Sequence, residues 1–218
     1  MITRYGIEVV ISVLLLSLVI ILISIFFIKI DFIKYALIVL SSALLIFTVY
    51  FFRDPDRITP KGENLIISPA DGKVIQIKDV YEDKYLKTDC TQISIFMSPL
   101  NVHVNRVAID GTVEYFEHIS GKYMVAFAEK SSTLNERTLI GINNGKQKLL
   151  FKQIAGFIAR RIVADLKVGM KVKAGERFGM IKFGSRVDVL IPKKSAIRIK
   201  LNENVHAGET ILAEMPNG

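Results

Sequence analysis

The sequence lacks several residues and signatures on which whole classes of function depend. Its 218 residues include one cysteine, Cys90, and no tryptophan, so no internal disulfide can form and no cysteine pair is available for a zinc or redox site. The three histidines, His103, His118 and His206, are isolated, without the i,i+4 spacing or neighbouring cysteines of a structural metal site. No Walker, GxGxxG, HExxH or GxSxG motif occurs. These absences exclude an extracellular disulfide scaffold, and we expect no metal site.

The apolar residues are concentrated in the first fifty positions. Residues 9–28 carry no charge, and a helix of this length, at about 1.5 Å per residue, spans about 30 Å, the thickness of a bilayer core. Residues 35–52 form a second uncharged run after a short charged connection. The pattern predicts a transmembrane helical hairpin over residues 1–52. A cleaved signal peptide is the alternative, but it would have an apolar stretch of about 7–15 residues and a small-x-small cleavage site, which is not evident.

The distribution of basic residues bears on orientation and on partners. The outer flanks of the hairpin carry Arg4, Arg53, Arg57 and Lys61. The connection carries only Lys29 and Lys34, so the positive-inside rule favours both termini in the cytoplasm. The whole chain has 29 lysines and arginines against 21 aspartates and glutamates, and a basic domain next to a bilayer meets anionic headgroups first. We therefore expect anionic membrane lipids as partners and no nucleic acid; a role of the charge in solubility or retention alone stays open.

After residue 52 the sequence changes to short β-branched runs separated by Gly, Asn and Asp, which is typical of strands. The runs are residues 65–68, 71–77, 91–97, 110–117, 123–128, 137–142 and 148–154. An Asn-Gly pair at 144–145 favours a tight hairpin. One short helix is expected at 157–166, where Phe157, Ile158, Ile162 and Leu166 follow a helical period. Residues 53–218 are therefore predicted to form a mainly β domain with one short helix.

Two segments, residues 168–176 and 205–211, share a sequence pattern. Each follows all or part of Val-x-x-Gly-x-x-Val-x-x-Gly and contains Ala-Gly-Glu before a new apolar run. They resemble the sandwiched-hairpin domains that carry biotin or lipoate. The Met-Lys-Met sequence that carries the modified lysine is missing. We therefore keep only the fold from this resemblance: a barrel-like or sandwiched-hairpin-like domain.

Four further islands stand out: residues 52–55 (FRDP), 68–74 (SPADGKV), 97–106 (MSPLNVHVNR) and 183–189 (FGSRVDV). In this order, and with 135–137 (NER) and 154–161 (IAGFIARR) before the last of them, they resemble phosphatidylserine decarboxylase proenzymes. The resemblance covers essentially all of residues 52–192 and is closest to the short branch of the family, in which a small catalytic domain follows an N-terminal hydrophobic hairpin. Asn101 departs from the pattern, because that position is often Asp.

The resemblance implies an enzyme that makes its prosthetic group from its own serine. Ser185 would attack the carbonyl carbon of Gly184, and β-elimination would cut the chain into residues 1–184 and 185–218. The cofactor would be the pyruvoyl group left at position 185, and no external cofactor would be needed. It would form a Schiff base with the amine of phosphatidylserine and draw off the electrons released with carbon dioxide, giving phosphatidylethanolamine. The two cleavage products would form a heterodimer, open to further oligomerisation, on the cytoplasmic face of the cell membrane.

His103 and Asp71 are the candidates for activating Ser185. A hydroxyl is a poor nucleophile and needs an adjacent base, commonly a histidine oriented by a carboxylate. The competing interpretations are a packed strand histidine for His103 and an ordinary turn residue for Asp71. Longer family members carry a second histidine where this chain has Arg106. Whether His103 serves in both self-cleavage and decarboxylation, or whether Asp188 or a water takes one of the roles, therefore stays open.

Two other functions remain compatible with the sequence. A non-enzymatic membrane adaptor or lipid-binding domain of sandwiched-hairpin type would account for the hairpin and the β domain, and it predicts an intact chain. A relative that has kept self-cleavage but uses another headgroup is the second. The decarboxylase hypothesis explains the hairpin, the basic domain and Gly184-Ser185 together, whereas the adaptor gives no reason for Gly184-Ser185. The sequence does not separate the decarboxylase from the relative with another headgroup or substrate.

Overall fold

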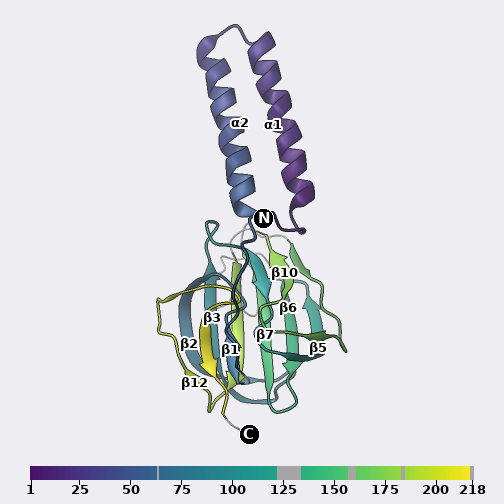
Figure 1. The fold of residues 1–218 in the computed structure, drawn as a ribbon, viewed down its shortest axis with the longest axis vertical. Helices are drawn as coiled ribbons and strands as arrows, with labels where there is room; N and C mark the ends of the chain where they lie inside the picture. Colours follow the sequence, from purple (N-terminus) through teal and green to yellow (C-terminus); the bar gives the residue numbers. More distant parts are fainter. Residues whose placement is uncertain (63, 122–133, 157–160, 183–184, 217–218) are drawn as a thin grey trace. The chain divides into compact units, whose positions relative to one another are not determined.

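The computed structural model describes the chain apart from residues 63, 122–133, 157–160, 183–184 and 217–218. Its contacts divide it into two compact units, Met1–Pro55 and Asp56–Gly218. The first unit contains the helices α1 (Ile7–Phe27) and α2 (Asp31–Phe51), and the second is built of strands (Figure 1). The strands are β1 (Leu65–Ile67), β2 (Gly72–Glu82), β3 (Thr88–Met97), β4 (Val104–Arg106), β5 (Gly111–Ile119), β6 (Arg137–Asn143), β7 (Lys148–Ala155), β8 (Ile162–Ala164), β9 (Lys171–Val172), β10 (Arg177–Ile181), β11 (Ser185–Pro192), β12 (Ala196–Ile197), β13 (Asn204–Val205) and β14 (Ile211–Glu214).

The two helices of the first unit pack side by side, with small polar residues between them and large apolar residues outside. Ser17 Oγ donates to the Ser41 carbonyl and Ser41 Oγ donates to the Ser17 carbonyl, both at 3.3 Å. Most of the leucine, isoleucine and phenylalanine side chains are exposed. Helices that associate in a bilayer show this pattern, because lipid chains solvate the apolar residues and small residues let the backbones approach. Both helices are long and apolar enough to cross a membrane.

Both helices begin a few residues earlier than the uncharged runs predicted. Glu8 lies in the first turn of α1 and Asp31 in the first turn of α2. A carboxylate near a helix N-terminus interacts favourably with the helix dipole. The prediction followed only the uncharged residues, and so it excluded these first turns.

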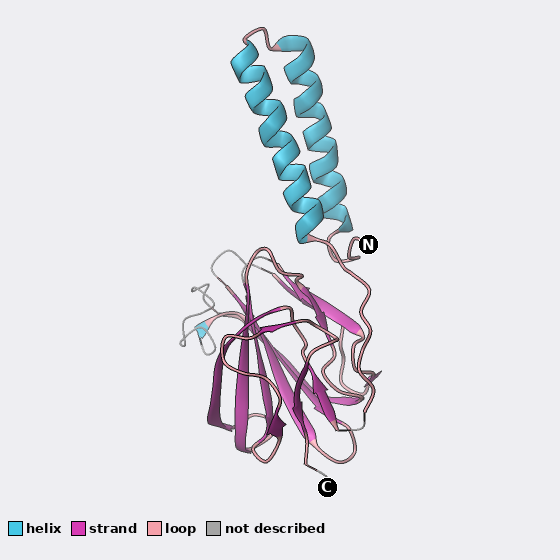
Figure 2. Ribbon diagram, turned by 60° about the vertical axis from the view of Figure 1, so that its left-hand side comes forward, coloured by secondary structure: helices cyan, strands magenta, loops and turns pink. Residues whose placement is uncertain are grey.

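The second unit is mainly β, as predicted, and its described strands form three sheets. The largest has eight strands in the order β13-β2-β3-β11-β7-β6-β5-β9, and the two smaller sheets have the orders β1-β14-β12 and β4-β10-β8. Figure 2 shows the long strands curled around a common interior. The predicted Asn-Gly hairpin joins β6 to β7, where Gly145 has φ +89° and its N–H is bound by Asn143 Oδ1 at 2.8 Å. The strand expected at 123–128 lies outside the described residues.

The core fills the inner face of the eight-stranded sheet. Ile93 and Ile95 of β3, Val187 and Val189 of β11 and Phe151 of β7 are fully buried. Alternate residues of a strand face the same side, so these positions mark the inner face. The ring of Phe151 lies 5.1 Å from the ring of Phe178 in β10, which packs a small sheet against the large one. Burial of each such side chain contributes about 1.5–3 kcal/mol.

The short helix predicted at 157–166 is wrong over the residues that the structure describes there. Ile162–Ala164 form strand β8, which pairs antiparallel with β10 through Met180↔Val163 and its neighbours. Residues 157–160 lie outside the described residues. The helical period of the apolar residues was outweighed by the β-branched pair Ile162-Val163 and by the hydrogen bonds that β10 offers along its edge.

Candidate active site

Ser185 is the first residue of β11, which lies in the middle of the eight-stranded sheet between β3 and β7. It is directly opposite Met97, the last residue of β3, and Ala155, the last residue of β7. Its side chain is fully buried and shares the inner face with Val187. Among the described residues its hydroxyl has one hydrogen-bond partner, the thioether of Met97 at 3.2 Å. The serine predicted to react is therefore held inside the protein, against a weak acceptor.

A pair of buried amides lies on the other side of Met97. Asn105 Nδ2 is 3.9 Å from Met97 Sδ and donates to the Pro69 carbonyl at 3.3 Å. Gln153 Nε2 donates to Asn105 Oδ1 at 2.9 Å. Gln153 Oε1 is a buried acceptor with no hydrogen-bond partner in the part of the chain that is described. These contacts fix the thioether and leave one acceptor on the inner face near Ser185.

His103 lies just before β4 and is fully buried. Its Nδ1 is 2.9 Å from the Asn101 carbonyl. Because a carbonyl only accepts, Nδ1 carries the proton, and Nε2 carries the lone pair that could accept one. Asn105, two residues farther along the chain, contacts Met97, which in turn contacts Ser185.

The turn before His103 depends on Asn101. Its Oδ1 accepts from Ser98 N at 2.9 Å and from Ser98 Oγ at 2.8 Å, and its carbonyl holds His103. An aspartate would offer the same oxygen. The departure from the family pattern at this position therefore keeps the group that shapes the turn.

Asp71 is buried at the start of β2, but its partners differ from those expected. Its Oδ2 is bound by Arg57 Nη2 at 2.9 Å, and its Oδ1 accepts from the Ala207 N–H at 2.7 Å. His206 Nδ1 lies 3.6 Å from Oδ2. In the described part of the chain no hydrogen bond joins Asp71 to His103 or to Ser185. Asp71 therefore ties Arg57 to the turn at 206–209.

Arg57 and His206 are site neighbours that the sequence analysis missed. Arg57 also binds Glu209 Oε2 at 2.6 Å. Burial raises the pKa of the Glu209 carboxyl, but the hydrogen bond and charge of Arg57 outweigh that effect, so the pKa lies below its ordinary value. The Ala-Gly-Glu segment at 207–209 was the one available signal, and it was interpreted as a fold texture.

Three stretches of the sequence islands, residues 68–74, 97–106 and 185–189, meet at one end of the sheet. Gly72 follows Asp71 and lies so close to β3 that an added Cβ would be 2.2 Å from the Phe96 carbonyl oxygen. Asn135 Nδ2 donates to the Ala155 carbonyl at 2.7 Å, on the strand next to Ser185. The starts of β2 and β11 and the ends of β3 and β7 thus collect the predicted site residues. Gly184 lies outside the described residues.

Asp188 does not belong to this inner face. It is two residues from Arg186 on β11, on the face opposite Ser185, and it forms an ion pair with Arg186 whose partners are both buried. A proton exchange between Asp188 and the Ser185 hydroxyl is therefore not favoured by the fold.

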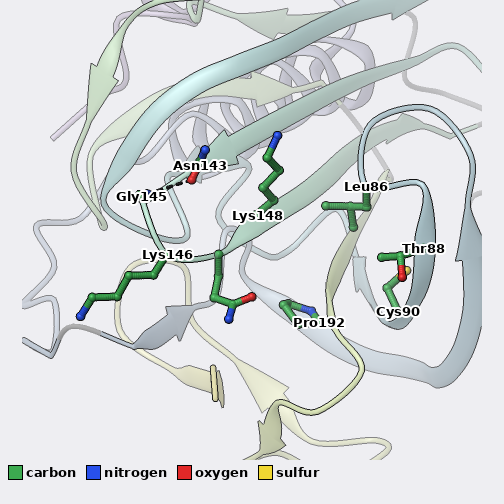
Figure 3. Close-up of a pocket in the computed structure, with 9 residues that line it drawn as sticks. Leu86, Thr88, Cys90, Asn143, Gly145, Lys146, Lys148 and Pro192 are labelled. Carbon is green, nitrogen blue, oxygen red and sulfur yellow. Dashed lines mark hydrogen bonds between the residues drawn. The ribbon is translucent and has the colours of Figure 1, made fainter. Parts of the chain in front are cut away.

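A separate hollow of about 310 Å³ lies at the other end of the sheet (Figure 3). It is lined by residues that include Cys90, Asn143, Lys146, Lys148 and Pro192. Pro192 ends the strand that Ser185 begins, and seven steps of about 3.3 Å place the two ends about 23 Å apart. Burial raises the pKa of the Cys90 thiol to about 11, so the thiol stays protonated at neutral pH and is a poor nucleophile. This hollow is distinct from the site around Ser185.

Fold and site together define a β-domain enzyme with a buried serine and histidine, preceded in the chain by two apolar helices. Comparison with known proteins gives the family. A family model described as phosphatidylserine decarboxylase matches residues 44–213. The phosphatidylserine decarboxylase proenzyme of Amoebophilus asiaticus is 51% identical over 181 residues, 83% of this chain and 80% of that protein. The protein of the same name from Prosthecochloris aestuarii is 42% identical over 218 residues, 100% of this chain and 99% of that protein.

The chain belongs to the phosphatidylserine decarboxylase family. The resemblance inferred from the sequence islands is confirmed. So is the enzyme class that it implied, a decarboxylase of a family whose members are named proenzymes.

Proposed function

We propose that this protein converts phosphatidylserine to phosphatidylethanolamine and carbon dioxide, using a pyruvoyl group made from Ser185. The observation that carries the proposal is the position of Ser185. It is buried at the head of a central strand, and its hydroxyl contacts Met97, which also contacts Asn105, two residues after the buried His103. Family membership supplies the substrate class, because the relatives are named for phosphatidylserine.

In the proposed self-cleavage the Ser185 hydroxyl attacks the carbonyl carbon of Gly184. His103 Nε2 takes the hydroxyl proton, and the peptide C–N bond gives way to an ester and a free amine. Loss of the Cα proton of residue 185 then breaks the Cβ–O bond and releases Gly184 as a carboxylate. Addition of one water and departure of one ammonia leave a keto group at residue 185. The balance is one water consumed and one ammonia released.

The surroundings of Ser185 fit such a group. Conversion replaces the hydroxymethyl side chain by a methyl group. Among the described residues the hydroxyl is hydrogen-bonded only to the thioether of Met97, so no strong hydrogen bond to them is lost and none of their charged groups is left buried alone. When formed, the group supplies a carbonyl that takes up the substrate amine and accepts the electrons released with carbon dioxide.

The chain's own residues supply the remaining steps. His103 donates a proton to the product from the inner face. Gln153 Oε1, a buried acceptor, is suited to a hydrogen-bond donor that enters the site. Asp71 acts in the same site as a fixed negative charge, positioned by Arg57 and by the Ala207 N–H.

The two cleavage products are expected to stay together. The short product, residues 185–218, contains β11, which pairs with β3 and β7 of the long product. It also contains β13, paired with β2, and β14, paired with β1. Cutting one peptide bond leaves all these ladders in place, which supports a heterodimer.

We further propose that α1 and α2 anchor the protein in the membrane with both chain ends in the cytoplasm, where the basic β unit meets anionic lipid. A cysteine at Ile30, between the helices, should react with a membrane-impermeant maleimide added to intact cells. A cysteine at Lys146, in the β unit, should react only after lysis. The native Cys90 gives little background because it is buried. The reverse labelling pattern would show the opposite orientation.

The decisive experiment is the mass spectrum of the denatured protein beside Ser185→Ala. We expect the unaltered protein to appear as fragments 1–184 and 185–218, the second lighter by one ammonia than simple hydrolysis gives. Ser185→Ala should stay whole, and Ser195→Ala, a matched change in the same fragment, should be cut normally. A folded but intact chain would remove the prosthetic group and favour the membrane adaptor instead.

A further inference from the structure

Arg186, the residue after Ser185, has a fully buried guanidinium on the opposite face of β11. Only 1% of the residue is exposed, and Asp188 is 0% exposed. Arg186 Nε donates to Asp188 Oδ1 at 2.5 Å and Nη2 donates to Oδ2 at 3.3 Å. The two residues are an i,i+2 pair on one face of the strand, so the fork of the guanidinium meets the carboxylate with two bonds.

The same guanidinium ties β11 to its neighbours. Nη2 donates to Ser94 Oγ on β3 at 2.8 Å and to Gln76 Oε1 on β2 at 3.3 Å. Ser94 is opposite Asp188 on one side and opposite Gln76 on the other. Three polar residues, Gln76, Ser94 and Asp188, therefore lie in a row across three strands within a few residues of Ser185, and Arg186 contacts all three.

Stability alone does not require charges at these positions. Burying an ion pair costs as much desolvation energy as the attraction returns, and apolar residues of similar size are often as stable. Farther along the same face β11 itself carries an apolar residue, Leu190, opposite the uncharged Gln92 of β3. The bonded pair next to Ser185 instead fixes one geometry, because each partner is costly to leave buried alone.

The proposed cleavage makes such a constraint necessary. Before it, residue 185 is held by the chain on both sides. Afterwards it is a chain end that has lost its nitrogen, and strand ends open more readily than strand interiors. Residue 186 is then the only covalent attachment of the reactive group.

We propose that Arg186, held by Asp188, Ser94 and Gln76, is the positioning residue that keeps residue 185 in place during self-cleavage and after it. The inference rests on the proposed function, since it assigns the geometry of the same serine. It assigns Arg186 no contact with substrate.

The test compares Arg186→Gln with Leu190→Ala, a change on the same face of the same strand that lowers stability to a comparable degree. Thermal unfolding of both, each combined with Ser185→Ala so that no chain is cut, measures stability apart from cleavage. Self-cleavage is then followed in the Ser185 proteins by mass spectrometry after synthesis in a cell-free system with detergent. Lys193→Gln is the second control, because it removes an exposed ion pair with Asp79 at the far end of β11.

We expect Arg186→Gln to slow self-cleavage at least about tenfold, because it removes hydrogen bonds to a charged group next to the reacting bond. Ser94→Ala, which removes one bond and folds more readily, should slow it about threefold. Leu190→Ala and Lys193→Gln should cleave within about twofold of the unaltered protein. In cleaved protein, Arg186→Gln should also speed hydrogen exchange at residues 186–188.

Equal slowing by Arg186→Gln and Leu190→Ala would reduce the effect to general stability and overturn the proposal, as would normal cleavage of Arg186→Gln and Ser94→Ala. Failure of the unaltered protein to cleave would instead overturn the proposed function, and with it the positioning role of Arg186. Normal cleavage of the unaltered protein together with an unchanged cleavage rate in Arg186→Gln would overturn only the positioning role of Arg186.

Discussion

The ion pair between Arg57 and Asp71 allows a direct test of how Asp71 acts. Asp71→Asn keeps the shape of the side chain and an oxygen for the Ala207 N–H, but it removes the charge that Arg57 meets at 2.9 Å. Breaking a buried pair costs about 3–5 kcal/mol when the other charge is left alone. Arg57 keeps Glu209 at 2.6 Å as a second partner, so we expect a smaller loss, about 2–3 kcal/mol.

This loss corresponds to a fall in Tm of about 4–12 °C for a chain of this size. It is measured by thermal unfolding in detergent, with Ser185→Ala present in every sample so that cleavage does not change the molecule. Arg57→Gln should lower Tm at least as much, since it leaves two carboxylates, Asp71 and Glu209, without their shared cation.

The rates of self-cleavage then separate two roles for Asp71. If it acts through Arg57 and the turn at 206–209, Asp71→Asn and Arg57→Gln should slow cleavage to a similar extent, within about threefold of each other. Abolished cleavage in Asp71→Asn beside normal cleavage in Arg57→Gln would refute this reasoning. It would assign Asp71 to the reacting groups, as the pairing with His103 predicted from sequence requires.

Three further predictions follow from described contacts. Gly72→Ala would place a Cβ 2.2 Å from a backbone oxygen of β3, so we expect a lower Tm and slower self-cleavage; an unchanged Tm would contradict the close approach of β2 and β3. Hydrogen bonds from the side chains of Asn143, Lys148 and Tyr85, of which that of Asn143 has the largest effect, lower the pKa of Glu114 from 4.5 to about 2. Its folded pKa is depressed, so Glu114 stabilises the fold above about pH 4.5 and that stabilisation disappears as the pH falls toward 2. In Glu114→Gln, Tm should fall less steeply as the pH is lowered from about 4.5 toward 2. An unchanged dependence of Tm on pH would argue against the lowered pKa of Glu114. Ser41→Ala removes one of the reciprocal bonds with Ser17, and should cost the hairpin about 0.6 kcal/mol in a bilayer; a loss above about 2 kcal/mol, measured by unfolding in lipid bicelles, would show that more than this bond was removed.

The elements that the sequence predicted well are those governed by local pattern. Uncharged length defined the two helices of the first unit, and β-branched runs separated by Gly and Asn defined the long strands. The helix expected at 157–166 was wrong at Ile162–Ala164 because β8 exists through its pairing with β10. That partner lies farther along the chain, and no periodicity within 157–166 reports it.

The site divides in the same way. Ser185 and His103 were predicted from motifs, and both are buried in the fold, while their catalytic roles stay predictions. The partners of Asp71 could not be found, because Arg57 and Ala207 reach it only after distant segments have met. Met97 was visible in a motif, but its contact with Ser185 follows from the register of β3 against β11.

The place of β11 in the sheet also determines the order of folding and the proposed self-cleavage. Because β11 has a neighbouring strand on each side, it must pair with β3 and β7 while the chain still connects it to β10. The covalent connection keeps the local concentration of β11 high and its register correct. Once β3 and β7 close on each other, a free 34-residue peptide spanning 185–218 would have to displace an existing ladder to enter. The proposed self-cleavage must therefore follow folding, and two separately made pieces should not rebuild the enzyme. Heat inactivation of the cut form would accordingly be a one-way process.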